Sequence, residues 1–418
     1  MARTTIYPSK VAGELVIPPS KSQTLRAILF AALGDGKSRI DRFLHSPDVS
    51  AMIEAMKLFG ATIDVQRETL RIDGIGALRA PVRDVIQCGN SGIVLRFLGA
   101  VASLLPTYTV LTGDESIRSR RPIAPLIEGL QGLGALAVSA RNDNFAPLIV
   151  RGPWIHKTTT LDGADSQPVS GLLIAGALAP GGIELNVRNP GEMPWIEMTL
   201  HWFRKLGIRY EGYKVFGGET IRPFEYAVPG DFSTAAFPIA AALLTDSELT
   251  LHELDWNEPQ GDKAFISIVQ QMGARVEISG RTVTVRRGGK LRGCTIDVNQ
   301  CIDALPVLAV LGCKAEGTTK LVNGHIARHK ESDRVAEMAF ALRAMGASVE
   351  EKPDGLEICQ SRLKGTELSC ANDHRIALAL ATAALNAEGP TTLHGTECAA
   401  KTYSNWETDF RNLGVRIE

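Results

Sequence analysis

The chain has almost no net charge and few aromatic residues. Its 45 Lys and Arg residues nearly balance 46 Asp and Glu residues, giving a net charge of −1, and Phe, Trp and Tyr make up only 6%. Proteins that bind nucleic acid usually present a basic surface, and those that bind single strands add aromatic platforms. We therefore expect no nucleic-acid partner.

Long apolar runs and clustered cysteines are also missing. No run of 18 apolar residues occurs, and the opening MARTTIYPSK has no apolar signal core, so we expect no membrane partner and a cytoplasmic location. The seven cysteines are scattered without a C-x-x-C pair, which is typical of reduced, structural thiols. His325 and His329 have no third ligand near them in the sequence, so we expect no metal site.

An internal repeat is the strongest pattern that the chain does contain. Six glycines each follow an amphipathic helical stretch and precede a short alternating strand: Gly60, Gly134, Gly207, Gly273, Gly346 and Gly414. Glycine suits a helix end because it adopts the left-handed conformation without strain. Their spacing of 66 to 74 residues fits a small α/β unit and is too long for a solenoid repeat. The sequence predicts six such units in two α/β domains.

The start of the chain is expected to complete the second domain. Strand patterns near residues 4–7 and 13–17 have no partners nearby, whereas the last repeat ends with a single strand. We expect one domain over residues 20–229 and another built from residues 1–19 and 230–418. The chain would then cross twice between the domains, forming a two-stranded hinge. A hinge suggests a cleft that closes on a substrate.

Basic and small polar residues recur where strands give way to helices. In P-P-S-K-S-Q-T-L-R-A, Lys21, Ser22 and Arg26 begin a helix whose free N–H groups attract anions. A capped helix with solvated basic residues explains this segment equally well.

Three further junctions follow in the first domain. Asn90 and Gly92 lie in C-G-N-S-G, Arg121 lies in R-S-R-R-P-I, and Ser166 with Gln167 lies in G-A-D-S-Q-P. Glycine permits close approach of a ligand to the backbone. A tight turn, a solvated face and a helix cap are the simpler interpretations of these three segments.

The second domain adds possible acid–base groups beside cations. These residues are Asp303 in I-D-A-L-P, Lys330, Glu331 and Arg334 in H-K-E-S-D-R, Arg375 in N-D-H-R-I-A, and Lys401 in A-K-T-Y. Surface ion pairing explains any one of these segments without a function. Their recurrence in nearly every repeat instead indicates a multiply anionic ligand, because Arg matches carboxylates and phosphates with two hydrogen bonds.

Read together, these motifs identify a resemblance. P-S-K-S-x-x-x-R-A, G-N-x-G-x-x-x-R, R-R-P-I, D-S-Q, I-D-x-x-P, K-E-S-D-R, D-H-R-I-A and A-K-T-Y occur in order over the whole chain. The chain resembles the 5-enolpyruvylshikimate-3-phosphate synthase family. That resemblance implies two inside-out α/β domains, each of three βαβαββ units. It also implies transfer of the enolpyruvyl group of phosphoenolpyruvate to the 5-hydroxyl of shikimate 3-phosphate, with release of phosphate.

The resemblance also implies roles for individual residues. The expected catalytic residues are Lys21, Asp303 and Glu331. Phosphoenolpyruvate is expected to bind Lys21, Asn90, Gly92, Arg121, Gln167, Arg334, Arg375 and Lys401. Shikimate 3-phosphate is expected to bind Lys21, Ser22, Arg26, Ser166, Gln167, Asp303 and Lys330. No cofactor and no metal are implied, and we expect a monomer.

The chain departs from the family pattern near the expected 3-phosphate. Asp165 replaces the first of two serines that usually precede the glutamine, and Glu192 and Trp195 replace a Ser-x-x-Tyr pattern. Carboxylates should repel a phosphate. We therefore expect both acidic side chains either to point away or to be offset by backbone N–H groups and a cation such as Arg188.

Two other replacements affect inhibition. Ile93 and Phe97 stand where the family usually has Thr and Pro. Extra volume in a packed helix can shift its backbone. We expect reduced sensitivity to glyphosate, an inhibitor of this family.

The motifs leave other functions open. An enolpyruvyl transferase that acts on a different alcohol would share most of these motifs. The enzyme acting on UDP-N-acetylglucosamine is disfavoured, because no cysteine lies between Thr112 and Pro122. The repeat also resembles RNA-cyclase and RNA-binding modules, but neither a basic face nor an aromatic platform supports that function.

Overall fold

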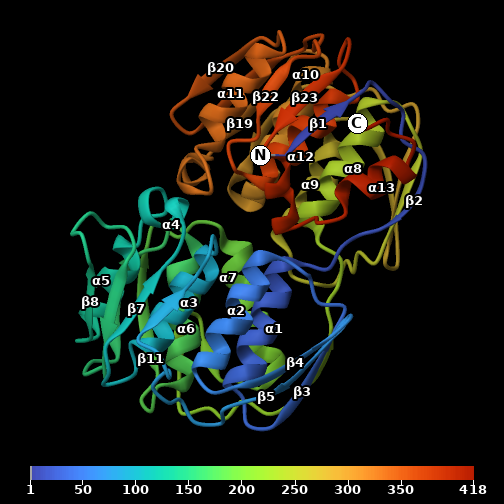
Figure 1. Cartoon of the computed structure of the whole chain (residues 1–418). Coiled ribbons are helices and arrows are strands. Elements are labelled where there is room, and N and C mark those ends of the chain that lie inside the picture. The colour runs from blue at the N-terminus through green and yellow to red at the C-terminus, as the bar shows by residue number, and fades with distance from the viewer. Residues whose placement is uncertain (1) are drawn as a thin grey trace. The chain divides into compact units, whose positions relative to one another are not determined.

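The computed structural model describes residues 2–418 and divides into two compact units (Figure 1). The N-terminal unit is Lys21–Val228, and the C-terminal unit combines the residues up to Ser20 with Pro229–Glu418. These limits lie within one residue of those expected from the sequence. Where the chain passes between the units, the Ser20 N–H donates to the carbonyl of Pro229 at 2.8 Å.

The N-terminal unit contains three four-stranded sheets of one topology. Its strands are β3 (Lys37–Asp41), β4 (Thr62–Gln66), β5 (Thr69–Asp73), β6 (Val85–Gln87), β7 (Thr109–Thr112), β8 (Leu136–Ser139), β9 (Leu148–Arg151), β10 (Thr158–Asp162), β11 (Ile183–Arg188), β12 (Tyr210–Glu211), β13 (Lys214–Val215) and β14 (Glu225–Ala227). The strand orders are β6-β7-β9-β8, β10-β11-β13-β12 and β14-β3-β5-β4. In each sheet the first pair is parallel and the others are antiparallel.

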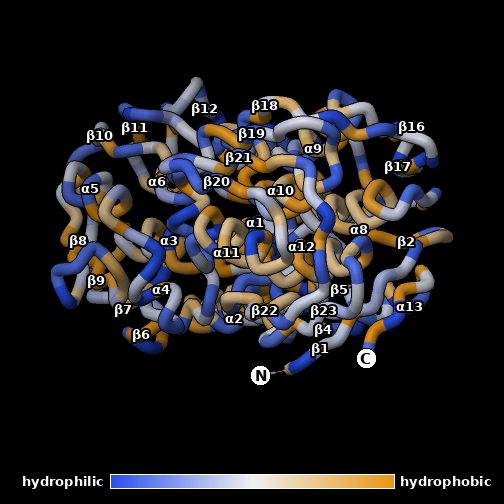
Figure 2. The backbone as a smooth tube through the Cα atoms, turned by 90° about the horizontal axis from the view of Figure 1, so that it is seen from above, coloured by the Kyte–Doolittle hydropathy of each residue, from blue (hydrophilic) through white to orange (hydrophobic). Residues whose placement is uncertain are grey.

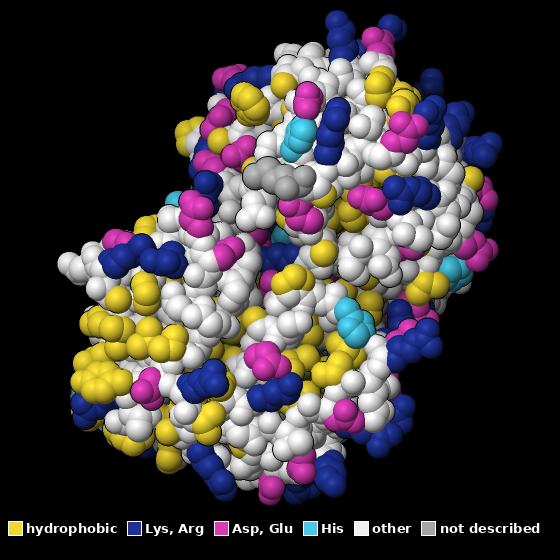
Figure 3. All heavy atoms as spheres, viewed as in Figure 1, with side chains coloured by type: hydrophobic (Ala, Val, Ile, Leu, Met, Phe, Trp, Pro, Cys, Tyr) yellow, Lys and Arg dark blue, Asp and Glu magenta, His cyan; other side chains and the backbone are white. Residues whose placement is uncertain are grey.

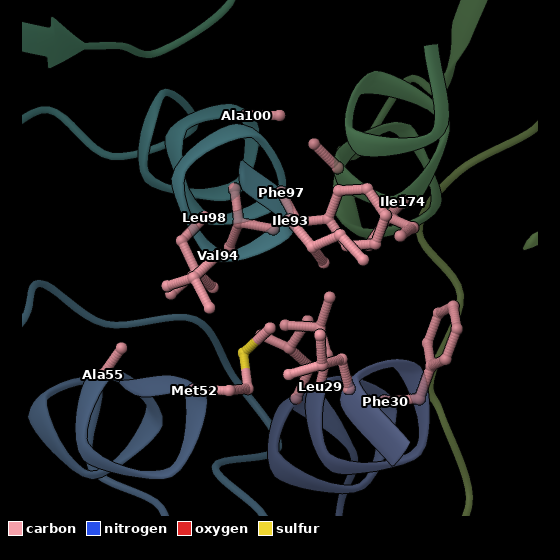
Figure 4. Packing of buried hydrophobic residues seen from close by; sticks show 14 of the residues in the cluster. Leu29, Phe30, Met52, Ala55, Ile93, Val94, Phe97, Leu98, Ala100 and Ile174 are labelled. Carbon is pink, nitrogen blue, oxygen red and sulfur yellow. The ribbon is translucent and has the colours of Figure 1, made fainter. Parts of the chain in front are cut away.

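The helices of this unit form its interior. They are α1 (Lys21–Leu33), α2 (Pro47–Leu58), α3 (Gly92–Ala102), α4 (Glu115–Ser119), α5 (Ala124–Gly132), α6 (Ser166–Leu178) and α7 (Met193–Leu206). Every residue of α3 is buried, and all of them except Arg96 are apolar. Figure 4 shows Leu29 of α1, Met52 of α2 and Phe97 of α3 meeting in this core. Helices inside and sheets outside give the inside-out arrangement.

The C-terminal unit repeats the same topology with strands from both ends of the chain. Its strands are β1 (Arg3–Ile6), β2 (Gly13–Val16), β15 (Leu249–His252), β16 (Arg275–Ser279), β17 (Thr282–Arg286), β18 (Thr295–Asp297), β19 (Thr318–Val322), β20 (Val349–Lys352), β21 (Gly355–Cys359), β22 (Glu367–Ser369) and β23 (Thr391–His394). The sheets are β16-β17-β15-β2, β18-β19-β21-β20 and β1-β23-β22. β2 lies parallel to β15, and Ile6 of β1 pairs with Ile417. As expected, the first residues complete this unit.

The helices of the C-terminal unit follow the same plan. They are α8 (Phe232–Leu244), η1 (Gly261–Lys263), α9 (Ala264–Gln271), η2 (Val298–Ala304), α10 (Leu305–Lys314), η3 (His325–His329), α11 (Arg334–Ala344), α12 (His374–Ala384), η4 (Thr396–Lys401) and α13 (Trp406–Asn412), where η marks 3₁₀ turns. α8, α10 and α12 are almost wholly buried. In Figure 2 much of α10 is orange, in keeping with its run of Leu, Val and Ala.

The six repeat glycines confirm the predicted period. Each lies just after one of the outer helices α2, α5, α7, α9, α11 and α13, with φ between 73° and 105°. A side chain at these turns would be strained. Each unit is therefore built from three βαβαββ repeats, in which the inner helix starts next to the end of a parallel strand.

The surface carries both charge signs without a large field of one sign on the face shown in Figure 3. Hydrophobic side chains gather over the α5 and β8 region of the N-terminal unit, where Leu136 and Val138 are 39% and 41% exposed. Among residues 2–418, no helix is long and apolar enough to cross a membrane.

Candidate active site

Most of the candidate residues lie at the N-terminal ends of helices in both units, at inner helices such as α3 and α6 and at outer ones such as α11. Three of the inner helices have a local cap: Ser91 accepts from Val94 N–H at α3, Asp165 from Gln167 N–H at α6, and Asp373 from Arg375 N–H at α12. Helix starts carry a partial positive charge and attract anions. The repeated topology therefore builds one half-site in each unit.

Gly92 marks the centre of the N-terminal half-site. A Cβ placed on Gly92 would lie 2.7 Å from Arg96 Nη1, 2.8 Å from Arg121 Nη1 and 2.8 Å from Gln167 Oε1. Asn90 Oδ1 accepts a hydrogen bond from Arg121 Nη2 at 3.1 Å. The structure thus brings together Asn90, Gly92, Arg121 and Gln167, which the sequence placed in three separate motifs.

Arg96 belongs to this cluster but was not predicted as a site residue. Its Nη1 donates to Gln167 Oε1 at 3.1 Å, its Nη2 donates to the Pro122 carbonyl at 2.9 Å, and Nη2 also lies 3.1 Å from Asp165 Oδ2. Arg96 stands four residues after Gly92, so both share one face of α3. That spacing in G-N-x-G-x-x-x-R is the signal that could have identified it.

The two carboxylates that differ from the family pattern, those of Asp165 and Glu192, both bond at the start of α6. Asp165 Oδ1 caps the Gln167 N–H at 3.0 Å while Oδ2 pairs with Arg96. Glu192 Oε2 accepts from the Ser166 N–H at 3.1 Å and from Ser166 Oγ at 2.9 Å. Backbone N–H groups therefore offset these charges, as expected.

The prediction that Arg188 offsets these carboxylates was wrong. Arg188 ends strand β11 and pairs with Glu128 at 2.6 Å, with 55% of the Arg188 side chain exposed. Its outward position follows from strand alternation, which turns every second side chain away from the core. Arg96 provides the charge that neutralises Asp165.

The first helix of the N-terminal unit carries Lys21, Ser22 and Arg26. Lys21 Nζ lies 3.8 Å from Asp48 Oδ2, and Ser22 is half-buried. Arg26 is buried beneath α7, where its Nη2 donates to the Trp195 carbonyl at 3.1 Å and its Nε to a threonine hydroxyl. Burial lowers the pKa of the Arg26 guanidinium to about 9.

Arg334 organises the C-terminal half-site. Its guanidinium lies 2.7 Å from Asp303 Oδ1, 3.0 Å from Glu331 Oε2 and 2.8 Å from Asp373 Oδ2. Burial alone would lower the pKa of Arg334, but the charges of Asp373, Glu331 and Asp303 raise it well above its usual range. Arg334 is therefore a permanent cation that holds three carboxylates in fixed orientations.

Glu331 also contacts a second cation. Lys401 Nζ donates to Glu331 Oε1 at 2.7 Å, and both residues are buried. Nδ1 of His374 lies 3.8 Å from Glu331 Oε1 and 3.6 Å from Asp373 Oδ1, so these three residues resemble a metal-ligand set. The carboxylate oxygens of Glu331 and Asp373 that a metal ion would need already accept hydrogen bonds from Lys401 and Arg334. A metal ion would have to displace them, so the cluster fits an ion-pair network better than a metal site.

Asp303 connects Arg334 with Arg375. Arg375 Nη2 lies 3.3 Å from Asp303 Oδ2, while Arg375 Nε and Nη1 are buried without a hydrogen-bond partner among residues 2–418. Buried donors of this kind are costly unless something binds them. An incoming carboxylate or phosphate would satisfy both.

Asp262 is a second residue that the sequence did not reveal. It is 1% exposed, contacts the Ser233 hydroxyl, and lies in the electrostatic field of Asp303 and Arg375. Burial, together with the charge of Asp303, raises the pKa of Asp262 to about 8. Its position in a short 3₁₀ turn gives no periodic signal.

Lys330 directly follows the η3 turn, is half-buried and directly precedes Glu331. The contacts described above thus join Asp303, Glu331, Arg334, Arg375 and Lys401 in one half-site and Asn90, Gly92, Arg121 and Gln167 in the other. Ser166 directly precedes Gln167 and bonds to Glu192. Lys21 and Arg26 contact Asp48 and α7 instead.

Comparison with known proteins identifies the family. The family model for EPSP synthase (3-phosphoshikimate 1-carboxyvinyltransferase) matches residues 6–410. A 3-phosphoshikimate 1-carboxyvinyltransferase from Acetivibrio thermocellus is 42% identical over 414 residues, which cover 98% of this chain and 97% of that one. One from Chlamydia muridarum is 42% identical over 420 residues, covering 99% and 95%. The solved EPSP synthase of Acinetobacter baumannii superposes with a TM-score of 0.82 at 28% identity, covering 100% and 99%.

Proposed function

Because the chain belongs to the EPSP synthase family, we propose that it transfers the enolpyruvyl group of phosphoenolpyruvate to the 5-hydroxyl of shikimate 3-phosphate, releasing phosphate. The observation that carries this proposal is Glu331 held between Arg334 and Lys401 at 3.0 and 2.7 Å. A carboxylate between two cations suits proton transfer beside an anionic substrate.

The reaction needs protons moved at two atoms. The hydroxyl of the acceptor loses a proton as its oxygen bonds to C2 of phosphoenolpyruvate, and the C3 methylene gains one. A proton then leaves C3 as phosphate departs and the double bond re-forms. Asp303 and Glu331 are the groups that we assign to these transfers, and Lys21 is the third residue that we assign to catalysis.

The cations and donors divide between the two substrates. We assign phosphoenolpyruvate to Lys21, Asn90, Gly92, Arg121, Gln167, Arg334, Arg375 and Lys401. Arg375 supports this assignment because its Nε and Nη1 are buried and have no hydrogen-bond acceptor among residues 2–418. The arginines would also stabilise the charge that develops on departing phosphate.

The acceptor would bind mainly to the N-terminal unit. We assign shikimate 3-phosphate to Lys21, Ser22, Arg26, Ser166 and Gln167, together with Asp303 and Lys330. The start of α6 supports this assignment, since its N–H groups and the Ser166 hydroxyl are donors suited to phosphate.

The test is phosphate release by purified protein given phosphoenolpyruvate and shikimate 3-phosphate. Release should require both substrates and should be absent when shikimate or UDP-N-acetylglucosamine replaces the phosphorylated acceptor. Release with another alcohol but none with shikimate 3-phosphate would overturn the assignment.

We further propose that the chain acts as a monomer in the cytoplasm. Both half-sites come from this one chain, so catalysis does not require a second copy. Light scattering should give a mass near 45.0 kDa in the absence and presence of substrates. A mass of twice that value would contradict the monomer.

A further inference from the structure

A protein carboxylate occupies the place at α6 that an anionic substrate would need. Glu192 precedes α7, is 2% exposed, and accepts hydrogen bonds from the N–H and the hydroxyl of Ser166, the first residue of α6. A backbone N–H with a hydroxyl at a helix start is the donor set that binds phosphate groups in proteins. Glu192 therefore satisfies donors that a ligand would otherwise take.

This contact is not part of the ordinary capping of the inner helices. Asp165 already caps α6 locally, as Ser91 caps α3, Asp231 caps α8 and Asp373 caps α12. At α6 a further carboxylate, from the residue that precedes α7, accepts from both the backbone N–H and the hydroxyl of the first helical residue. The second carboxylate adds negative charge to a site already holding one.

The backbone of Glu192 is also unusual. It has φ 47° and ψ 38°, a left-handed conformation that is strained for a residue with a Cβ. A strained residue beside a candidate binding site is poised to change conformation when a competing group satisfies its partners.

Nearby, a buried cation points to an anion independently of α6. Arg26 donates to the Trp195 carbonyl in the first turn of α7, the helix that Glu192 precedes, and its other bonds go to Thr199 Oγ1 and the Ser22 carbonyl. All three acceptors are neutral. A buried guanidinium whose acceptors are neutral favours the arrival of a negative charge.

We propose that Glu192 is an internal competitor for the phosphate of the acceptor and leaves Ser166 when that phosphate binds. The inference rests on the proposed function, because it concerns the acceptor assigned to Ser166. Asp165 does not share this role, since Arg96 neutralises it at 3.1 Å. Glu192 thus lowers the affinity for phosphorylated acceptors and leaves the affinity for unphosphorylated ones unchanged.

The test combines two changes at Glu192 with a ligand that lacks the phosphate. Glu192→Gln keeps the side-chain length without the charge, and Glu192→Gly removes the side chain at a φ that glycine favours. Calorimetry should show shikimate 3-phosphate binding roughly tenfold or more tightly to both variants, because a competing charged hydrogen bond is lost. Binding of shikimate should change less than twofold.

Two controls keep the result interpretable. Glu197→Gln alters an exposed carboxylate on the same helix and should leave both affinities unchanged. Inorganic phosphate serves as a probe that does not depend on the acceptor, and it should bind more tightly to Glu192→Gly than to the parent protein.

The outcomes separate this inference from the proposed function. Weaker binding of shikimate 3-phosphate to both variants, or equal gains for shikimate, would overturn the competitor role. A parent protein that releases no phosphate from both substrates would instead overturn the proposed reaction. The inorganic phosphate measurement would still decide the role of Glu192 in that case.

Discussion

Glu331 is placed so that its proton-transfer role can be separated from its structural role. Its two oxygens accept from Lys401 and Arg334, and its side chain is 7% exposed. Glu331→Gln retains size and one acceptor but removes the titratable group. We expect kcat to fall by about 10²–10⁴-fold, with KM for phosphoenolpyruvate changed much less.

Steady-state phosphate release measures both parameters. Glu350→Gln, which alters a carboxylate 66% exposed on β20, is the matched control and should behave as the parent. Turnover near the parent value in Glu331→Gln would remove this residue from the mechanism.

Asp262 predicts a pH dependence of folding stability. Its pKa rises from 3.8 to about 8 in the folded protein, first through burial and then through the charge of Asp303. Between those pH values the folded state holds a proton that the unfolded state has released. The free energy of unfolding therefore decreases as pH rises from about 4 to about 8, with a slope of up to ~1.4 kcal/mol per unit.

Asp262→Asn should remove this contribution and flatten the stability profile. Denaturant unfolding at pH 5 and pH 8 measures the difference, and Glu211→Gln, on an exposed strand residue, should leave it unchanged. An identical slope in parent and Asp262→Asn would show that Asp262 is ionised in the folded state.

The site residues that could not be predicted from the sequence are single polar groups whose neighbours in the structure come from distant segments. The sequence shows Asp373 only as a member of the D-H-R-I-A motif and does not predict its bond to Arg334, which lies 39 residues away. Asp262 stands alone in its turn. Pairing across such distances depends on sheet order, which local patterns do not contain.

At the scale of elements, the helix ends were the most predictable feature. The six glycines specify a backbone conformation by their own chemistry, and the alternating residues after them specify the strand face. The starts of the inner helices were predictable for the same local reason, because Asp and Ser caps act within three residues. The cation that pairs with Asp165 was not predictable in this way. Whether Arg96 or Arg188 points toward Asp165 depends on how α3 and β11 orient their side chains in the folded unit.

Helix α3 gives the clearest packing prediction. Phe97 is fully buried in the apolar core (Figure 4), and the Arg26 guanidinium lies 5.2 Å from its ring centroid. Phe97→Ala should lower the free energy of unfolding by about 3–5 kcal/mol, because it leaves a cavity in the core. Phe340→Ala, at a site 70% exposed, should change it by less than about 0.5 kcal/mol.

Chemical denaturation decides between these values. A loss of under 1 kcal/mol at Phe97 would mean that the core between α1 and α3 relaxes around the cavity. Ile93 and Phe97 are both accommodated in that core, and reduced glyphosate sensitivity stays a prediction for inhibition measurements.

At the scale of the whole molecule, nearly equal numbers of opposite charges are arranged into concentrated pairs. The net charge is −1, yet one half-site alone gathers Arg334, Arg375 and Lys401 around Asp303 and Glu331. Composition excluded a general anion-binding surface but could not reveal this local concentration. The repeat contributes to it, because helical segments from several βαβαββ units supply these residues.

The division of the assigned residues between two units leads to the last prediction. Shikimate 3-phosphate is assigned partners in both units, including Lys21 in one and Asp303 in the other. A ligand shifts a conformational equilibrium only when it binds one state better, and a state in which both sets reach it offers more contacts. We therefore expect saturating shikimate 3-phosphate to reduce the radius of gyration measured by small-angle scattering. Inorganic phosphate alone, too small to contact both sets, should not. An unchanged radius at saturation, established by calorimetry on the same sample, would contradict closure and leave each half-site to act without the movement of its unit.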